Sequence, residues 1–156
     1  MSDSGTKLFD EALSPERVFV TRFDSKEAVL NFLIQSLWDS GEVQDLEAFR
    51  AAVFMRESLM STGIGLGVGV PHARLSSVRR MIMAVAVNAT PLDDYESIDG
   101  HPVRLVALVA GRTDQQSNYV RLLATLSRLV KDESRREHLR DAADPETVYH
   151  LLRNGL

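Results

Sequence analysis

Two continuous apolar runs restrict the fold of this chain more than any other feature. They are MIMAVAV at residues 81–87 and VRLVALVAG at residues 103–111. Apolar and polar residues do not alternate in these runs, as they would in a strand with one face in solvent. Runs of this kind are typical of strands that are covered on both faces. A shorter strand is predicted at RVFV, residues 17–20.

Helical patterns lie on both sides of these runs in the sequence. The order of helices, then strands, then helices predicts an α/β fold in which a central sheet is covered by helices on both sides. We expect one domain over residues 1–156, with residues 1–12 as a loose or weakly helical lead-in. Helix starts are predicted from capping boxes at Asp24-Ser-Lys-Glu27 and Thr113-Asp-Gln-Gln116, from a capping aspartate at Asp132, and from proline at a first helical position at Asp144-Pro145. A further helix is predicted over about residues 45–59.

Composition narrows the classes of function. No apolar run approaches the roughly 20 residues of a membrane-spanning helix. The N-terminus lacks the layout of a signal peptide, so we expect a cytoplasmic protein. A net charge of −4 disfavours nucleic acid as a partner. The absence of cysteine excludes disulfides, a thiolate nucleophile and a cysteine-based zinc site.

The C-terminal segment carries basic and acidic residues side by side. We interpret it as a solvated, salt-bridged surface, and a basic patch that docks an acidic partner is the alternative. The basic residues are Arg121, Arg128, Lys131, Arg135, Arg136 and Arg140, and the acidic ones are Asp132, Glu133, Glu137 and Asp141.

Glycine occupies every second position from 63 to 69 in GIGLGVGVPHARL, residues 63–75. The spacing fits neither G-x-G-x-x-G nor a Walker loop, so a phosphate cradle is not supported. A period of two predicts a strand whose other face is bare, a place where a ligand or another backbone approaches closely. Pro71 should weaken strand pairing, which would put His72 just beyond the strand end. The alternative is that the glycines serve packing and that His72 is an ordinary polar residue.

Two arginines accompany His72 in this region. Arg56, at the end of the preceding predicted helix, could fold back toward His72, and Arg74 lies two residues beyond it. Arginine suits a phosphoryl group because its guanidinium is a planar fork of donors. The alternative for Arg56 is a surface pair with Glu57. No two histidines have zinc-site spacing, so no metal is predicted.

The run RESLMSTGIGLGVGVPHARL, residues 56–75, resembles the phosphorylation-site signature of enzyme IIA domains. These domains form the fructose/mannitol/nitrogen-regulatory class of the bacterial phosphoenolpyruvate phosphotransferase system. The resemblance extends over about residues 13–152 and implies a mixed sheet sandwiched by helices. It implies His72 as the phosphoryl acceptor, with phosphorylation at Nε2 favoured, and Arg56 as an active-site arginine. Thr62 and Arg74 are further candidates for support of the phosphoryl site.

The resemblance also implies partners. The donor would be a phosphorylated histidine phosphocarrier protein, and the acceptor a IIB domain or a regulatory target. The chain would be a phosphoryl carrier rather than a turnover enzyme, without a metal or other cofactor. We further expect the bare glycine face to let a partner's histidine or cysteine close on the site.

One departure from the family pattern concerns the site itself. The family has a second active-site histidine in a segment like H-L-x-L-L-A, and here the segment is YVRLLA, with Tyr119 in its place. Tyrosine can donate a hydrogen bond to a phosphoryl oxygen but cannot become cationic. Alternatively, Tyr119 only packs at the helix start. Two functions therefore stay open: a phosphocarrier or phosphorylation-switched regulator of the nitrogen type, and an interaction module with little or no phosphoryl transfer.

Overall fold

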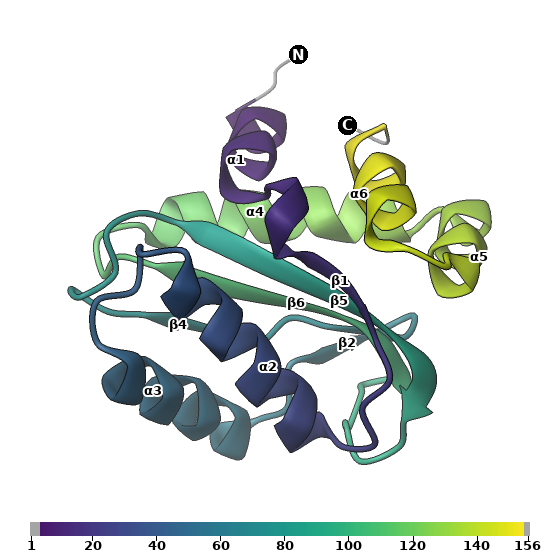
Figure 1. Ribbon diagram of the computed structural model, residues 1–156, viewed down its shortest axis with the longest axis horizontal. Helices are drawn as coiled ribbons and strands as arrows, with labels where there is room; N and C mark the ends of the chain where they lie inside the picture. The colour runs from purple at the N-terminus through teal and green to yellow at the C-terminus, as the bar shows by residue number, and fades with distance from the viewer. Residues whose placement is uncertain (1–3, 155–156) are drawn as a thin grey trace.

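A computed structural model describes residues 4–154 of the chain, and its helices and strands alternate in irregular order (Figure 1). The helices are α1 Ser4–Ala12, the short 3-10 helix η1 Pro15–Arg17, α2 Lys26–Asp39, α3 Leu46–Leu59, α4 Gln116–Val130, α5 Glu133–Asp141 and α6 Pro145–Arg153. The strands are β1 Val18–Thr21, β2 Gly63–Gly65, β3 Val68–Gly69, β4 His72–Arg74, β5 Ile82–Leu92 and β6 Val103–Gly111.

These strands form one six-stranded mixed sheet in the order β1-β5-β6-β3-β2, with β4 also paired to β6. The antiparallel pair β5 and β6 forms its centre, and both apolar runs of the sequence lie in it. β1 runs parallel to β5, and β3 and β4 run parallel to β6. The prediction of a central sheet built on these runs is confirmed.

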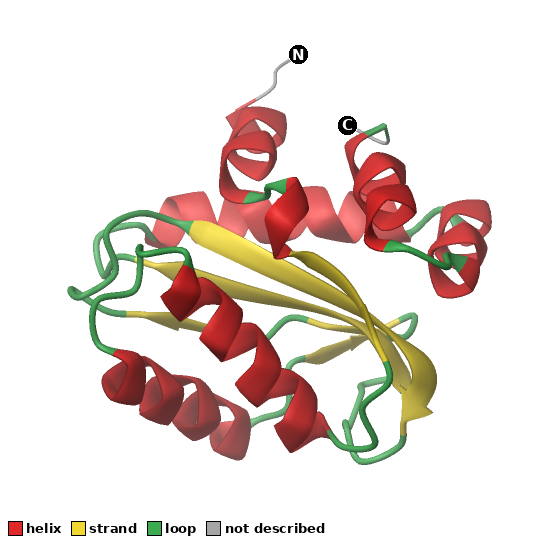
Figure 2. Ribbon diagram, in the orientation of Figure 1, coloured by secondary structure: helices red, strands yellow, loops and turns green. Residues whose placement is uncertain are grey.

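Helices cover both faces of the sheet (Figure 2). α2 and α3 lie on one face, while α1, α4, α5 and α6 lie on the other. Alternate residues of β5 enter opposite apolar clusters, Met83 and Val85 on one side and Ala84 and Ala86 on the other. No helix within residues 4–154 is long and apolar enough to cross a membrane.

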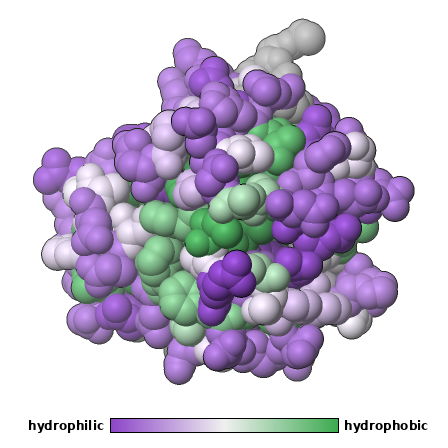
Figure 3. Space-filling view, turned by 45° about the vertical axis from the view of Figure 1, so that its right-hand side comes forward, coloured by the Kyte–Doolittle hydropathy of each residue, from purple (hydrophilic) through white to green (hydrophobic). Residues whose placement is uncertain are grey.

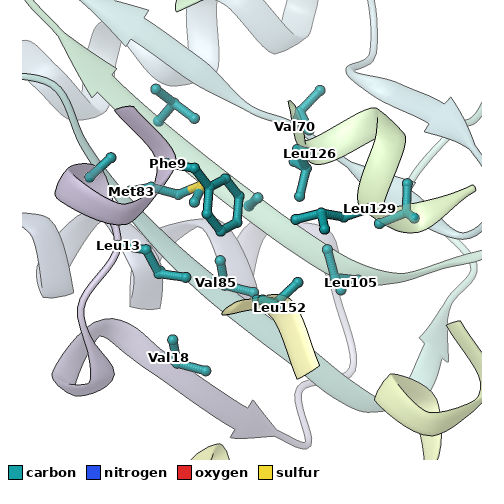
Figure 4. Close-up of a cluster of buried hydrophobic side chains, with 14 of the residues drawn as sticks. Phe9, Leu13, Val18, Val70, Met83, Val85, Leu105, Leu126, Leu129 and Leu152 are labelled. Atoms are coloured by element: carbon teal, nitrogen blue, oxygen red, sulfur yellow. The ribbon is translucent and has the colours of Figure 1, made fainter. Parts of the chain in front are cut away.

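The N-terminal segment was expected to be a loose or weakly helical lead-in. Its described part, residues 4–12, forms α1, and the side chain of Phe9 is fully buried. In Figure 4, Phe9 lies between Met83 of the sheet and Leu126 of α4, with Leu13 nearby. Of the two alternatives for this lead-in, the helical one holds for residues 4–12, and apolar side chains of this short helix complete one of the two cores.

Helix starts follow the predicted capping residues in part. Ser25, rather than Asp24, caps α2, and its hydroxyl accepts from the N–H of Ala28. The predicted capping box at Thr113 is wrong, because α4 begins after Gln115 without a side-chain cap. Asp132 caps α5 as expected, α6 begins at the predicted Asp144-Pro145, and the side chains of Asp144 and Asp45 also cap α6 and α3.

The glycine stretch does not form the single strand that its period of two predicts. β2 and β3 pair antiparallel, with a turn at Leu66-Gly67 between them. Leu66 has a φ of 61°, and the glycines on either side of it also have positive φ. The chain therefore reverses at Leu66, and the side chains of residues 63–70 do not share one continuous face.

The glycines at two of these positions allow close internal packing. A Cβ on Gly69 would lie 2.6 Å from the ring of Tyr95, and one on Gly63 would overlap the carbonyl oxygen of Glu96. Both glycines are buried. The close approach that was expected from a partner protein is thus made here by the segment around residues 95–96 of the chain itself.

Candidate active site

His72 is the first residue of β4 and lies next to Val109 of β6 in the parallel register. The carbonyl of Pro71 accepts a hydrogen bond from the N–H of Val109 at 3.0 Å. Pro71 itself belongs to neither β3 nor β4, which agrees with the predicted weakening of the pairing. His72 therefore lies inside the sheet, just after the break between strands β3 and β4, rather than beyond a strand end.

Two oxygen atoms approach the same ring nitrogen of His72. The carbonyl oxygen of Val70 lies 3.1 Å from Nδ1, and the hydroxyl oxygen of Tyr119 lies 2.8 Å from it. A carbonyl oxygen can only accept, so this pair requires a proton on Nδ1. In the neutral ring the lone pair is then on Nε2. The carbonyl of Val70 thus favours the tautomer whose lone pair is on Nε2.

Tyr119 comes from the first turns of α4 and lies against the imidazole. The two ring centroids are 4.4 Å apart, with an angle of 35° between the ring planes. Burial raises the pKa of Tyr119 to about 12, so its hydroxyl keeps its proton near neutral pH. In this structure the hydroxyl lies beside Nδ1 of His72.

The surroundings of His72 favour its neutral form. Its pKa is lowered from the ordinary value chiefly by burial, while the hydrogen bond with Val70 acts in the opposite direction. The positive charges of Arg56 and Arg74 lower this pKa further. Neutral imidazole is the form that can attack phosphorus, because protonation would occupy its lone pair.

The structure brings both predicted arginines to His72. A shallow depression of about 460 Å³ is lined by Ala52, Arg56, His72, Ala73, Arg74 and Thr113. Arg56 uses one donor on the carbonyl of Met60, at 2.6 Å. Arg74 donates to the carbonyl of Thr113 at 3.1 Å and to the side-chain oxygen of Gln116 at 3.3 Å. Each guanidinium keeps further N–H donors for an anion in the depression.

Thr62 is not part of this group. Its side chain is buried, and its hydroxyl bonds to the carboxylate of Glu57 and to the hydroxyl of Tyr95, which lies 2.7 Å away. Glu57 also forms an ion pair with Lys26 at 2.7 Å. Thr62 therefore supports the backbone before β2 rather than the space above His72.

Sequence reasoning missed the buried role of Glu57. It considered only a surface ion pair between Glu57 and the adjacent Arg56. The structure separates them, with Glu57 buried toward Lys26 and Arg56 directed toward the depression. The signal available was the helical spacing, since Glu57 follows the buried residues Phe49 and Val53 at intervals of four.

Residues 11–155 match the protein family described as "Phosphoenolpyruvate-dependent sugar phosphotransferase system, EIIA 2". The chain is 31% identical to a fructose-specific EIIA component of Haloferax volcanii, over 82% of each protein. It is 32% identical to a fructose-specific EIIABC component of Bacillus subtilis, over 81% of this chain and 20% of that protein. The chain thus spans about a fifth of the length of this second relative.

Solved structures agree with the fold. The nitrogen regulatory protein IIA-Ntr from Neisseria meningitidis superimposes with a TM-score of 0.80 at 26% identity, over 93% of this chain and 99% of that one. A mannitol IIA enzyme of Escherichia coli, solved in complex with a phosphorylated IIB enzyme, superimposes with a TM-score of 0.77 at 23% identity, over 91% and 97%. The second likeness concerns the fold alone.

Proposed function

Since this chain belongs to the EIIA 2 family of the phosphoenolpyruvate-dependent sugar phosphotransferase system, we propose that it is a phosphoryl carrier whose acceptor atom is Nε2 of His72. The contact of the Val70 carbonyl with Nδ1, at 3.1 Å, carries this proposal. It supports a ring proton on Nδ1, which would leave the lone pair on Nε2 for the incoming phosphorus.

The transfer step conserves charge and protons. The Nε2 lone pair forms a bond to the phosphorus of a donor phosphohistidine, the donor's phosphorus–nitrogen bond breaks, and its electron pair stays on the donor ring. The proton on Nδ1 of His72 does not move. Positive charge develops on the His72 ring, and the carbonyl of Val70 stabilises it through that proton.

Arg56 and Arg74 would position and neutralise the phosphoryl oxygens. Both line the depression that contains His72, and Arg74 is fixed by its bonds to Thr113 and Gln116. Phosphoryl transfer is accelerated mainly by positioning and by stabilisation of charge on the oxygens. Two guanidinium groups beside one imidazole supply both effects.

The partners proposed are a phosphorylated histidine phosphocarrier protein as donor and a IIB domain or a regulatory target as acceptor. Apolar side chains lie exposed on the two helices that contribute Arg56 and Tyr119: Met55, Leu59 and Met60 at the end of α3, and Val120 on α4. Exposed apolar residues on the elements that contribute to the site favour a protein partner over a small substrate. The complex of a mannitol IIA with phosphorylated IIB supports a IIB acceptor.

Tyr119 motivates the second candidate, an interaction module that is not phosphorylated. Its hydroxyl contacts Nδ1, the nitrogen opposite the proposed acceptor atom. The tyrosine therefore leaves Nε2 unobstructed by its hydroxyl. Together with the family membership, this geometry favours the carrier.

A labelling experiment tests the carrier. The protein is incubated with labelled phosphoenolpyruvate, enzyme I and the histidine phosphocarrier, and acid-labile phosphate is measured. We expect label on the wild type and on His138→Ala, an exposed histidine on α5, and none on His72→Ala. Absence of label on the wild type with a cognate donor, or retention of label by a folded His72→Ala, contradicts the proposal.

A further inference from the structure

A second cavity, of about 540 Å³, lies toward the other end of strand β6 from the position that pairs with His72. Leu105 of β6 lines it, whereas Val109, four residues further along the same strand, is paired with His72. This spacing corresponds to roughly 13 Å along the strand. The cavity and the depression at His72 have no lining residue in common, so they are separate sites.

The inner wall of this cavity is apolar. It is built from buried side chains of the sheet and of the two helices above it, namely Val68, Val87, Leu105, Val130 and Leu139. Figure 3, turned so that the right-hand side of Figure 1 comes forward, shows apolar residues exposed among hydrophilic ones on the face in view. A volume of this size suits a small organic molecule, since ligand pockets are typically about 300–1,000 Å³.

Three arginines line the cavity, together with one carboxylate. Arg104 is held by the carbonyls of Asn88 and Ala89, and Arg136 by those of Val130 and Lys131. Arg140, on the exposed side of α5, makes no hydrogen bond or ion pair within residues 4–154. The lining is therefore cationic, with one guanidinium whose donors are all available.

The carboxylate of Asp99 offsets only part of this positive charge at the cavity. It accepts from the N–H of Leu66 at 2.9 Å and from the N–H of His101 at 3.1 Å. These two hydrogen bonds lower its pKa, so it stays ionised while its oxygens are occupied by the backbone. The three arginines outnumber it and leave a net positive lining.

We propose that this cavity binds a small organic anion, with an oxyanion headgroup at Arg140 and an apolar body against Val68, Leu105 and Leu139. The apolar wall favours a hydrocarbon or aromatic body, because burial of apolar surface drives its transfer from water. Guanidinium groups pair well with carboxylate and phosphate oxygens, which selects the headgroup. The site lies apart from His72 and requires no phosphorylation.

The proposal is tested with octanoate and octyl phosphate as the two anionic probes and 1-octanol as the neutral one. Each is titrated into the ¹⁵N-labelled protein, and amide shifts are followed by NMR. We expect saturable shifts at Val68, Leu105 and Leu139 with at least one anion, and at least tenfold weaker binding of 1-octanol. The tighter anion identifies the headgroup as carboxylate or phosphate.

Two charge reversals give a matched comparison. Arg140→Glu should weaken binding of the anion at least fivefold, because it places a negative charge beside the headgroup. Arg128→Glu, at an exposed arginine of α4 outside the cavity, should change it less than twofold. His72→Ala should bind the anion like the wild type, which separates this site from the carrier function. Three outcomes overturn the proposal: no saturable shift with either anion, equal binding of 1-octanol, or equal effects of the two reversals.

Discussion

The hydroxyl of Tyr119 lies 2.8 Å from Nδ1 of His72, the same ring nitrogen that faces the carbonyl of Val70. With the proton on Nδ1, the ring can donate to both oxygens, and the two rings pack with their centroids 4.4 Å apart. Tyr119 thus acts on the orientation of the imidazole. For the proposed carrier, we therefore expect Tyr119 to affect the rate of transfer by positioning His72 rather than by accepting phosphate.

The first prediction concerns the Tyr119 hydroxyl. Tyr119→Phe keeps the ring contact with His72 and removes one hydrogen bond, which contributes about 0.5–1.5 kcal/mol. The initial rate of phosphorylation should fall by about two- to twelvefold, while the Nδ1–H tautomer persists because Val70 still accepts the proton. Rate and tautomer are measured by label incorporation and by ¹⁵N NMR of the imidazole. A change of tautomer would show that Tyr119, and not Val70, sets it.

The second prediction concerns pH. Burial lowers the pKa of His72, so its NMR titration midpoint should lie below the ordinary value of about 6.5. Below pH 6.5 the unfolded chain then binds more protons at this residue than the folded one. The contribution of His72 to stability is therefore present above pH 6.5 and decreases as the pH falls through the folded-state pKa.

The control for this prediction is His72→Gln, which removes that part of the pH dependence. Urea denaturation of both proteins between pH 8 and pH 5 provides the comparison. A His72 midpoint at or above 6.5 contradicts the effect assigned to burial.

The third prediction concerns Arg56. Arg56→Ala should lower the rate of phosphorylation at least about tenfold, because a preorganised donor to the phosphoryl oxygens is lost. Arg56→Lys should recover part of the rate, since it restores the charge but not the planar fork. Arg50→Ala, on the same helix and outside the depression, is the control and should leave the rate unchanged. Equal rates for Arg56→Ala and Arg50→Ala would exclude a role for Arg56.

The fourth prediction concerns stability. Glu57 is buried, lies 2.7 Å from Lys26 and accepts from both the N–H and the hydroxyl of Thr62. Glu57→Ala should lower the free energy of unfolding by about 3 kcal/mol, because it leaves a partly buried ammonium and a hydroxyl without this acceptor. Urea denaturation at constant pH measures the change.

Glu47→Ala is the matched control on the same helix. Its carboxylate pairs with Arg50 but is 79% exposed, so its loss should cost less than about 1 kcal/mol. Equal destabilisation by the two substitutions would contradict the account of the Glu57 contacts.

Local sequence patterns predicted the central strands well. The apolar runs at residues 81–87 and 103–111 lie in β5 and β6, because continuous burial on both faces leaves a clear signal. The glycine stretch was predicted less well. A period of two cannot distinguish one strand from two short strands joined by a tight turn, and the reversal at Leu66 depends on backbone angles that the spacing does not encode.

The candidate site was likewise predictable in part from the sequence. His72 and Arg56 stand out in the sequence by residue type and order, and the structure places them on one depression. The selection of the Nδ1–H tautomer was not predictable, because it depends on the path of the backbone from Val70 through Pro71. Thr62 was misplaced since its buried partners, Glu57 and Tyr95, are brought together only by the folded chain.

The most direct test of the central claim identifies the nitrogen that carries the phosphoryl group. The ¹⁵N-labelled protein is phosphorylated through enzyme I and the histidine phosphocarrier, and its ³¹P–¹⁵N couplings are recorded. The account predicts that phosphorus couples to Nε2 of His72, with the tautomer before phosphorylation protonated on Nδ1. Phosphorus coupled to Nδ1, or attached to any other residue, would contradict it.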